Sequence, residues 1–114
     1  MAVSDEWLQD MLIFYKRELE DSKIDFVIFG HLGDNHLHIN LLPKNNQIKK
    51  ANDVYQKLIN RILAWNGTVS AEHGIGKLKK KYFLQMVGES SLKELKNIKK
   101  MFDPKLILGT GNIF

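Results

Sequence analysis

Apolar residues recur at intervals of three and four in two long stretches of the chain, and this spacing predicts amphipathic helices. The first stretch covers residues 4–22, and the second covers residues 47–65 and ends at the stop signal Asn66-Gly67. A capping box, Ser91-Leu92-Lys93-Glu94, predicts a further helix that follows a lysine-rich helical turn and ends at Asp103-Pro104. The residues of this helix expected to face inward are Leu92, Leu95, Ile98 and Phe102.

Three shorter segments have the pattern of β-strands. Residues 24–29 are almost all β-branched or aromatic, which predicts a buried central strand. Residues 36–42 alternate between polar and apolar side chains and end at Pro43, so we expect one polar and one apolar face. Residues 68–71 predict a short third strand. The order of elements predicts an α+β fold: a two-layer, ferredoxin-like sandwich in which helices cover the Leu37/Ile39/Leu41 face of an antiparallel sheet.

The composition of the chain limits the class of protein, its partners and its cellular location. With 114 residues the chain is one domain, and with no cysteine it has neither disulfides nor thiolate metal sites. The net charge of +4 comes mostly from lysine, whereas nucleic-acid readers rely on arginine, so we expect no nucleic-acid partner. No apolar run approaches the roughly 20 residues of a transmembrane helix, and the N-terminus does not resemble a secretory signal. We expect a cytoplasmic protein that meets a membrane only through a partner.

Three of the four histidines lie between positions 31 and 38. Alternation along a strand places His36, His38 and Asn40 on one face, which is costly unless something polar lies over it. The fourth histidine follows an acid in Glu72-His73, at the end of the predicted third strand. These residues have two interpretations: metal ligands beside a general base, or an N-capping acid with structural and exposed imidazoles. Histidines and a carboxylate suit Zn²⁺, Mn²⁺ or Fe²⁺.

Three motifs in this order resemble the C-terminal domain of FAD-linked oxidases, of the glycolate oxidase, D-lactate dehydrogenase and D-2-hydroxyglutarate dehydrogenase type. The segment from Gly30 to Asn40 resembles GHxGDGNxHxN, and the segment from Gly67 to Gly76 resembles GTxxxEHGxG. The closing segment from Phe102 to Phe114 resembles FDPxxxLNPGKxF. The resemblance covers roughly residues 24–114.

The resemblance implies that residues 1–114 form the substrate and metal domain that covers the flavin, while a separate N-terminal domain holds FAD. By position in the motifs, it implies His31, His38 and Glu72 as metal ligands, Asn40 as a substrate contact and His73 as the catalytic base. The implied reaction is oxidation of a 2-hydroxy acid, with hydride transfer from C2 to flavin N5 and electrons passing on to an acceptor subunit. Zinc is the expected metal, with manganese and iron as alternatives.

The chain departs from the family pattern at three points. Asn35-His36 replaces the Gly-Asn of the first motif, and residues 109–112 replace the Asn-Pro-Gly-Lys of the third. The FAD-binding domain is absent, so we expect either an excised piece of a longer protein, which we favour, or a separate subunit. The isolated chain should bind no FAD and oxidise no hydroxy acid. The alternative function is a non-catalytic metal-binding or interaction module.

Overall fold

A computed structural model describes residues 1–113 of the chain, which form two compact units. The first unit comprises Met1–Ala71, and the second begins at Glu72. No helix among the described residues is both long enough and apolar enough to cross a membrane.

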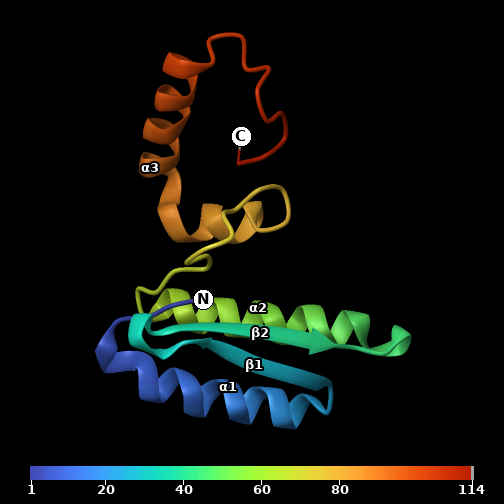
Figure 1. Cartoon of the computed structure of the whole chain (residues 1–114). Coiled ribbons are helices and arrows are strands. Elements are labelled where there is room, and N and C mark those ends of the chain that lie inside the picture. Colours follow the sequence, from blue (N-terminus) through green and yellow to red (C-terminus); the bar gives the residue numbers. More distant parts are fainter. Residues whose placement is uncertain (114) are drawn as a thin grey trace. The chain divides into compact units, whose positions relative to one another are not determined.

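The first unit contains two helices and a two-stranded sheet, joined by short 3₁₀ turns (Figure 1). Helix α1 covers Leu8–Ser22 after the 3₁₀ turn Asp5–Trp7, and helix α2 covers Ile48–Ala64 after the turn Asn45–Gln47. Both helices were predicted, and each differs from its predicted bounds by only a few residues. Asn66 ends the α2 segment as expected, with a left-handed φ of 55°, and Gly67 N–H donates to the Ile62 carbonyl at 2.9 Å.

Strands β1 (Asp25–His31) and β2 (His36–Leu42) pair antiparallel, and their register divides the side chains between two faces. Phe29 faces His38 and His31 faces His36, so these four side chains share one face. Leu37, Ile39 and Leu41 lie on the other face, and Leu37 is only 3 % exposed. The predicted alternation and the α+β class are therefore confirmed.

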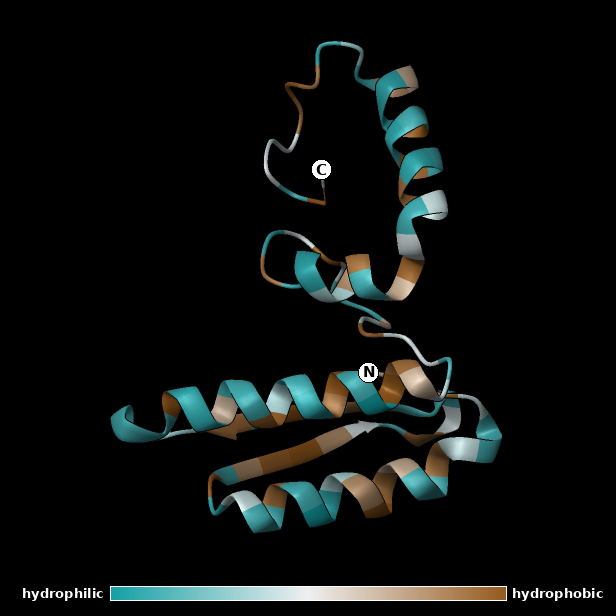
Figure 2. Cartoon of the chain, turned by 180° about the vertical axis from the view of Figure 1, so that it is seen from behind, coloured by the Kyte–Doolittle hydropathy of each residue, from teal (hydrophilic) through white to brown (hydrophobic). Residues whose placement is uncertain are grey.

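The apolar face of the strands packs with α1 and α2 into one core. Figure 2 shows β1 as a nearly unbroken apolar band, while both helices alternate between polar and apolar residues. Tyr15 is fully buried, and its hydroxyl donates to the Met1 sulfur at 3.4 Å. Burial raises the pKa of Tyr15 above its ordinary value, with a smaller contribution from Tyr55. The fully buried side chains are Tyr15, Met11, Leu19, Leu58, Ile59, Ile62 and Val69.

The prediction that β1 is a buried central strand is wrong. Within the described residues β1 pairs with β2 alone, and Val27 and Phe29 are 48 % and 50 % exposed. Only alternate residues, Phe26 and Ile28, are half-buried. An unbroken apolar run indicates burial on both faces, but here Val27 and Phe29 on the second face remain half-exposed.

The predicted third strand is reduced to one bridge. Ala2 N–H donates to the Thr68 carbonyl at 3.1 Å, and Thr68 N–H donates to the Ala2 carbonyl at 2.8 Å. Ala2 also bridges to His36, so the first residues lie between β2 and Thr68. The ladder stops there because the Ser70 N–H turns back to the Thr68 hydroxyl at 3.3 Å, which gives the backbone a local partner in place of a strand.

The second unit is built around helix α3, Lys80–Phe102, which is broken at Gly88 by the non-helical angles φ 72° and ψ 175°. Its end at Asp103 was predicted. The prediction that one side of this helix, including Phe102, faces inward is wrong. No residue of α3 is buried, and Phe102 is 82 % exposed. Within residues 72–113, α3 is the one helix that the structure describes and no strand faces it. Within these residues, the unit therefore has no second layer that could bury the apolar side of α3.

Asp103 organises the turn after α3. One carboxylate oxygen accepts from Lys99 Nζ at 2.5 Å and from Leu108 N–H at 2.9 Å, and the other accepts from Ile107 N–H at 3.1 Å. These hydrogen bonds, that of Lys99 above all, hold the pKa of Asp103 below its ordinary value. Phe114, the last residue of the predicted closing motif, lies outside the described residues.

Candidate metal centre

The turn between β1 and β2 places His31 and His36 directly opposite each other. Its residues Leu32–Asp34 form a 3₁₀ turn, and Asn35 closes it in the left-handed conformation with φ 49°. Asparagine tolerates this conformation better than most residues. The Asn35 side chain also donates to the Asp5 carboxylate, which ties the turn to the start of the first helical segment.

Gly30 allows the two strands to approach closely beside the histidines. A Cβ atom at this position would lie 2.1 Å from the His36 carbonyl oxygen and 2.9 Å from the Leu37 Cα. Any side chain would therefore collide with the β2 backbone. The histidine end of the hairpin depends on glycine here for space, not for backbone conformation.

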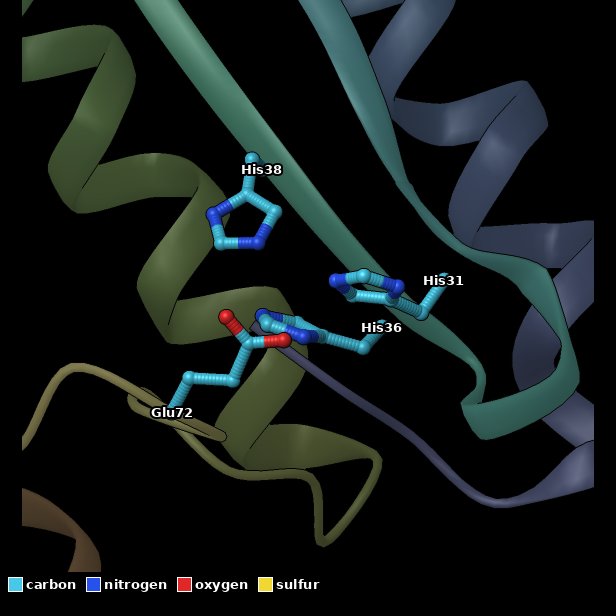
Figure 3. Close-up of side chains that lie close together, drawn as sticks. All are labelled: His31, His36, His38 and Glu72. Atoms are coloured by element: carbon cyan, nitrogen blue, oxygen red, sulfur yellow. The ribbon is translucent and has the colours of Figure 1, made fainter.

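The imidazoles of His31, His36 and His38 converge on one point above the sheet (Figure 3). The ring centroids lie 4.3 Å apart for His36 and His38, 5.9 Å for His31 and His36, and 6.1 Å for His31 and His38. Each ring offers a nitrogen within 4.8 Å of the others. Ligands about 2.1 Å from one zinc ion lie roughly 3–4 Å apart, so small side-chain rotations suffice to bring these nitrogens to a shared ion.

The three rings differ in their exposure to solvent. His36 is 4 % exposed, His38 is half-buried and His31 is exposed. The ring of Phe29 stacks on that of His38, with centroids 4.9 Å apart and planes inclined by 12°. Burial of one imidazole and stacking of another restrict their rotamers, which lowers the entropy lost when a ligand binds.

Glu72 is the third ligand that the family resemblance implies, and its carboxylate suits the same metals as the imidazoles. It is the first residue of the second unit and is joined to Ala71 of the first by one peptide bond. Its carboxylate forms an ion pair with His73, with 3.3 Å between Nε2 and Oε2. The His73 side chain is 71 % exposed and does not belong to the candidate metal group.

Asn40 lies on the histidine-bearing face of β2, two residues beyond His38 and opposite Val27. Its side chain is exposed. The carboxamide is thus placed beside the cluster without being part of it, where it can donate to or accept from a bound molecule.

The donor set suits a divalent transition metal. Neutral imidazoles and a carboxylate bind Zn²⁺, Mn²⁺ or Fe²⁺, whereas Mg²⁺ and Ca²⁺ prefer oxygen ligands alone. The structure brings together His31 and His38, which the family resemblance implies as ligands. It adds His36, which the sequence placed on the same face without assigning it a role. The alternation along β2 was the signal that could have identified it.

Comparison with known proteins places the chain in one family. The sequence model of the FAD linked oxidases, C-terminal domain, matches residues 1–113, so the match includes the first helix, which the motifs did not reach. The chain is 31 % identical to a mitochondrial D-lactate dehydrogenase (cytochrome) of Kluyveromyces lactis, over 100 % of this chain and 20 % of the relative.

Two bacterial relatives have similar coverage. A D-2-hydroxyglutarate dehydrogenase of Stutzerimonas stutzeri is 34 % identical over 79 % of this chain and 20 % of its own length. The glycolate oxidase subunit GlcD of Bacillus subtilis is 27 % identical over 80 % of this chain and 20 % of its own length. The chain thus spans about a fifth of the length of these relatives. It belongs to the family of FAD-linked oxidase C-terminal domains.

Proposed function

We propose that this chain is the substrate and metal domain of an FAD-dependent 2-hydroxy-acid dehydrogenase or oxidase. Family membership supports a role beside a flavin, and the similar proteins include D-lactate and D-2-hydroxyglutarate dehydrogenases and a glycolate oxidase subunit. Its partners would be an FAD-binding domain or subunit and an electron-acceptor subunit. The proposed location is cytoplasmic, with any membrane contact made through a partner.

The convergence of the histidine rings on one face of the β1–β2 hairpin carries this proposal. His31 and His38 would bind a divalent metal, with Glu72 as a further ligand, and zinc suits this set best. A substrate with adjacent hydroxyl and carboxylate oxygens can chelate such an ion, so the cluster favours a 2-hydroxy acid over a simple alcohol.

The surrounding residues can orient the substrate and accept its proton. When bound, the metal supplies a Lewis acid and FAD supplies the hydride acceptor for C2 at N5. Asn40 can donate a hydrogen bond to the substrate carboxylate from the same face of β2. His73 is the proposed general base: its imidazole is exposed and paired with a carboxylate, which can orient the ring and stabilise it once it is protonated.

The test separates the metal ligand from the base. In the enzyme that this chain forms with its FAD-binding domain or subunit, His38→Ala should lose both metal and oxidation of D-lactate, glycolate or D-2-hydroxyglutarate. His73→Ala should keep the metal and lose about 10²–10⁴-fold in kcat. Metal content by mass spectrometry and stopped-flow flavin reduction measure the two effects. A His38→Ala enzyme with full metal content would contradict the assignment.

A non-catalytic metal-binding module is the second candidate. One observation favours it: the three histidines all belong to the first unit, so metal binding by this hairpin needs no flavin. Tight metal binding that has no influence on any hydroxy-acid oxidation would support this candidate. The isolated chain should in either case bind no FAD and reduce no dye in the presence of these acids.

A further inference from the structure

We propose that His36 is a third imidazole ligand of the metal, so that one hairpin supplies His31, His36 and His38. This inference rests on the metal role proposed above and enlarges its ligand set. The family motif described above has asparagine at this position, so the additional ligand would set this chain apart within its family.

The register of the hairpin brings His36 into the cluster. It begins β2, lies directly opposite His31 and is two residues before His38, so all three side chains leave the same face. Its ring centroid is 4.3 Å from that of His38, the shortest ring separation among the three. A ligand set restricted to His31 and His38 would therefore leave out the imidazole that lies closer to His38 than His31 does.

The backbone of His36 has a pairing partner on both sides, His31 on β1 and Ala2. Ala2 bridges to it, and Leu37, its neighbour, donates its N–H to the Met1 carbonyl at 2.9 Å. The close approach of Gly30 fixes the opposite strand. His36 is only 4 % exposed, whereas His31 is exposed. A ring held in place before the metal arrives loses little rotamer entropy on binding.

Three imidazoles change what the site can do. Three histidines with an open fourth position form a known catalytic zinc set, and a single rigid hairpin supplies all of them here. Glu72 or the substrate oxygens can then occupy the remaining positions. The metal should consequently stay bound when the carboxylate is removed, which a set of two histidines and Glu72 would not permit. The site is thus a histidine site first, with Glu72 as an exchangeable ligand.

Zinc binding to the 114-residue chain tests the ligand set. Calorimetric titration against a competing chelator should show that His36→Asn and His36→Gln weaken Zn²⁺ binding by about 100-fold or more, since loss of an outer-shell partner alone costs about 10–100-fold. Glu72→Gln should have a smaller effect. His73→Asn is the comparison, because it removes a histidine outside the cluster; through its ion pair with Glu72 it should weaken Zn²⁺ binding no more than Glu72→Gln does.

Two further measurements make every outcome informative. Circular dichroism of the metal-free variants identifies any that fail to fold. Zinc-edge X-ray absorption of the wild type, which needs no variant, should show three imidazoles around the ion. Two imidazoles there, or His36 variants that fold and bind Zn²⁺ as tightly as the wild type, would overturn the proposal for His36 alone. A wild type that binds no Zn²⁺ would overturn the metal role itself.

Discussion

Replacing Gly30 with alanine should dismantle the histidine end of the hairpin. The new Cβ would lie 2.1 Å from the His36 carbonyl oxygen and 2.9 Å from the Leu37 Cα. Both neighbours are backbone atoms of β2, and the Met1–Val3 segment holds β2 from its other side. The strain therefore cannot be relieved by rotating a side chain. The strands must move apart where His31 faces His36.

The loss of stability in Gly30→Ala can be estimated from these backbone contacts. Overpacking in a well-packed region costs about 1–3 kcal/mol, and a backbone collision belongs at the upper end, at about 3 kcal/mol. For a folding unit of this size, that loss lowers Tm by about 12–24 °C. Displacement of His31 and His36 should also weaken Zn²⁺ binding, because ligands of one ion tolerate little change in their separation.

Gly33 provides the matched control within the same hairpin. A Cβ there meets nothing within 4 Å, and its φ is not in the left-handed region. Gly33→Ala should be neutral or stabilise the protein by about 0.4–1 kcal/mol through the unfolded state. Thermal and urea denaturation, followed by circular dichroism, measures both variants. If Gly30→Ala is as stable as Gly33→Ala, the tight strand approach is wrong.

Two further predictions concern the core and the turn after α3. Leu58→Ala should cost about 2–5 kcal/mol in the free energy of unfolding because Leu58 is fully buried, whereas Leu78→Ala, at a 93 % exposed position, should change it by less than about 0.5 kcal/mol. Urea denaturation compares the two. Asp103 has a pKa lowered in the folded state, so its stabilisation is present above the ordinary aspartate pKa of about 4 and is lost as pH falls through the lower, folded value. Hydrogen exchange should show Ile107 and Leu108 amides losing protection over that acid range. Asp103→Asn keeps only one accepting oxygen, so it should lose the hydrogen bonds at one of the two oxygen positions at neutral pH and abolish this acid transition.

The sequence predicted β2 well because its polar and apolar residues alternate strictly. That period fixed which face His36, His38 and Asn40 occupy, and the structure has the same division. It could not show how far apart the rings lie, since this depends on the register with β1 and on the turn that Asn35 closes. His36 received no role from the sequence for the same reason.

The failed predictions share a cause: an apolar sequence pattern does not show which part of the chain covers the apolar surface. The run from 24 to 29 looked buried on both faces, yet β1 leaves Val27 and Phe29 half-exposed. The apolar residues on one side of α3 were predicted to face inward, yet Phe102 and Ile98 are 82 % and 51 % exposed. An apolar pattern shows that a surface can be buried, while the layer that buries it depends on contacts distant in the sequence.

The most direct test of the metal assignment is a crystal structure of this chain grown with Zn²⁺, with diffraction recorded on both sides of the zinc absorption edge. We expect one strong anomalous peak above the β1–β2 hairpin, about 2.1 Å from a ring nitrogen of each of His31, His36 and His38. His73 should lie outside this coordination shell. Zinc bound elsewhere, with no peak at the three histidines, would contradict the assignment of these residues as metal ligands.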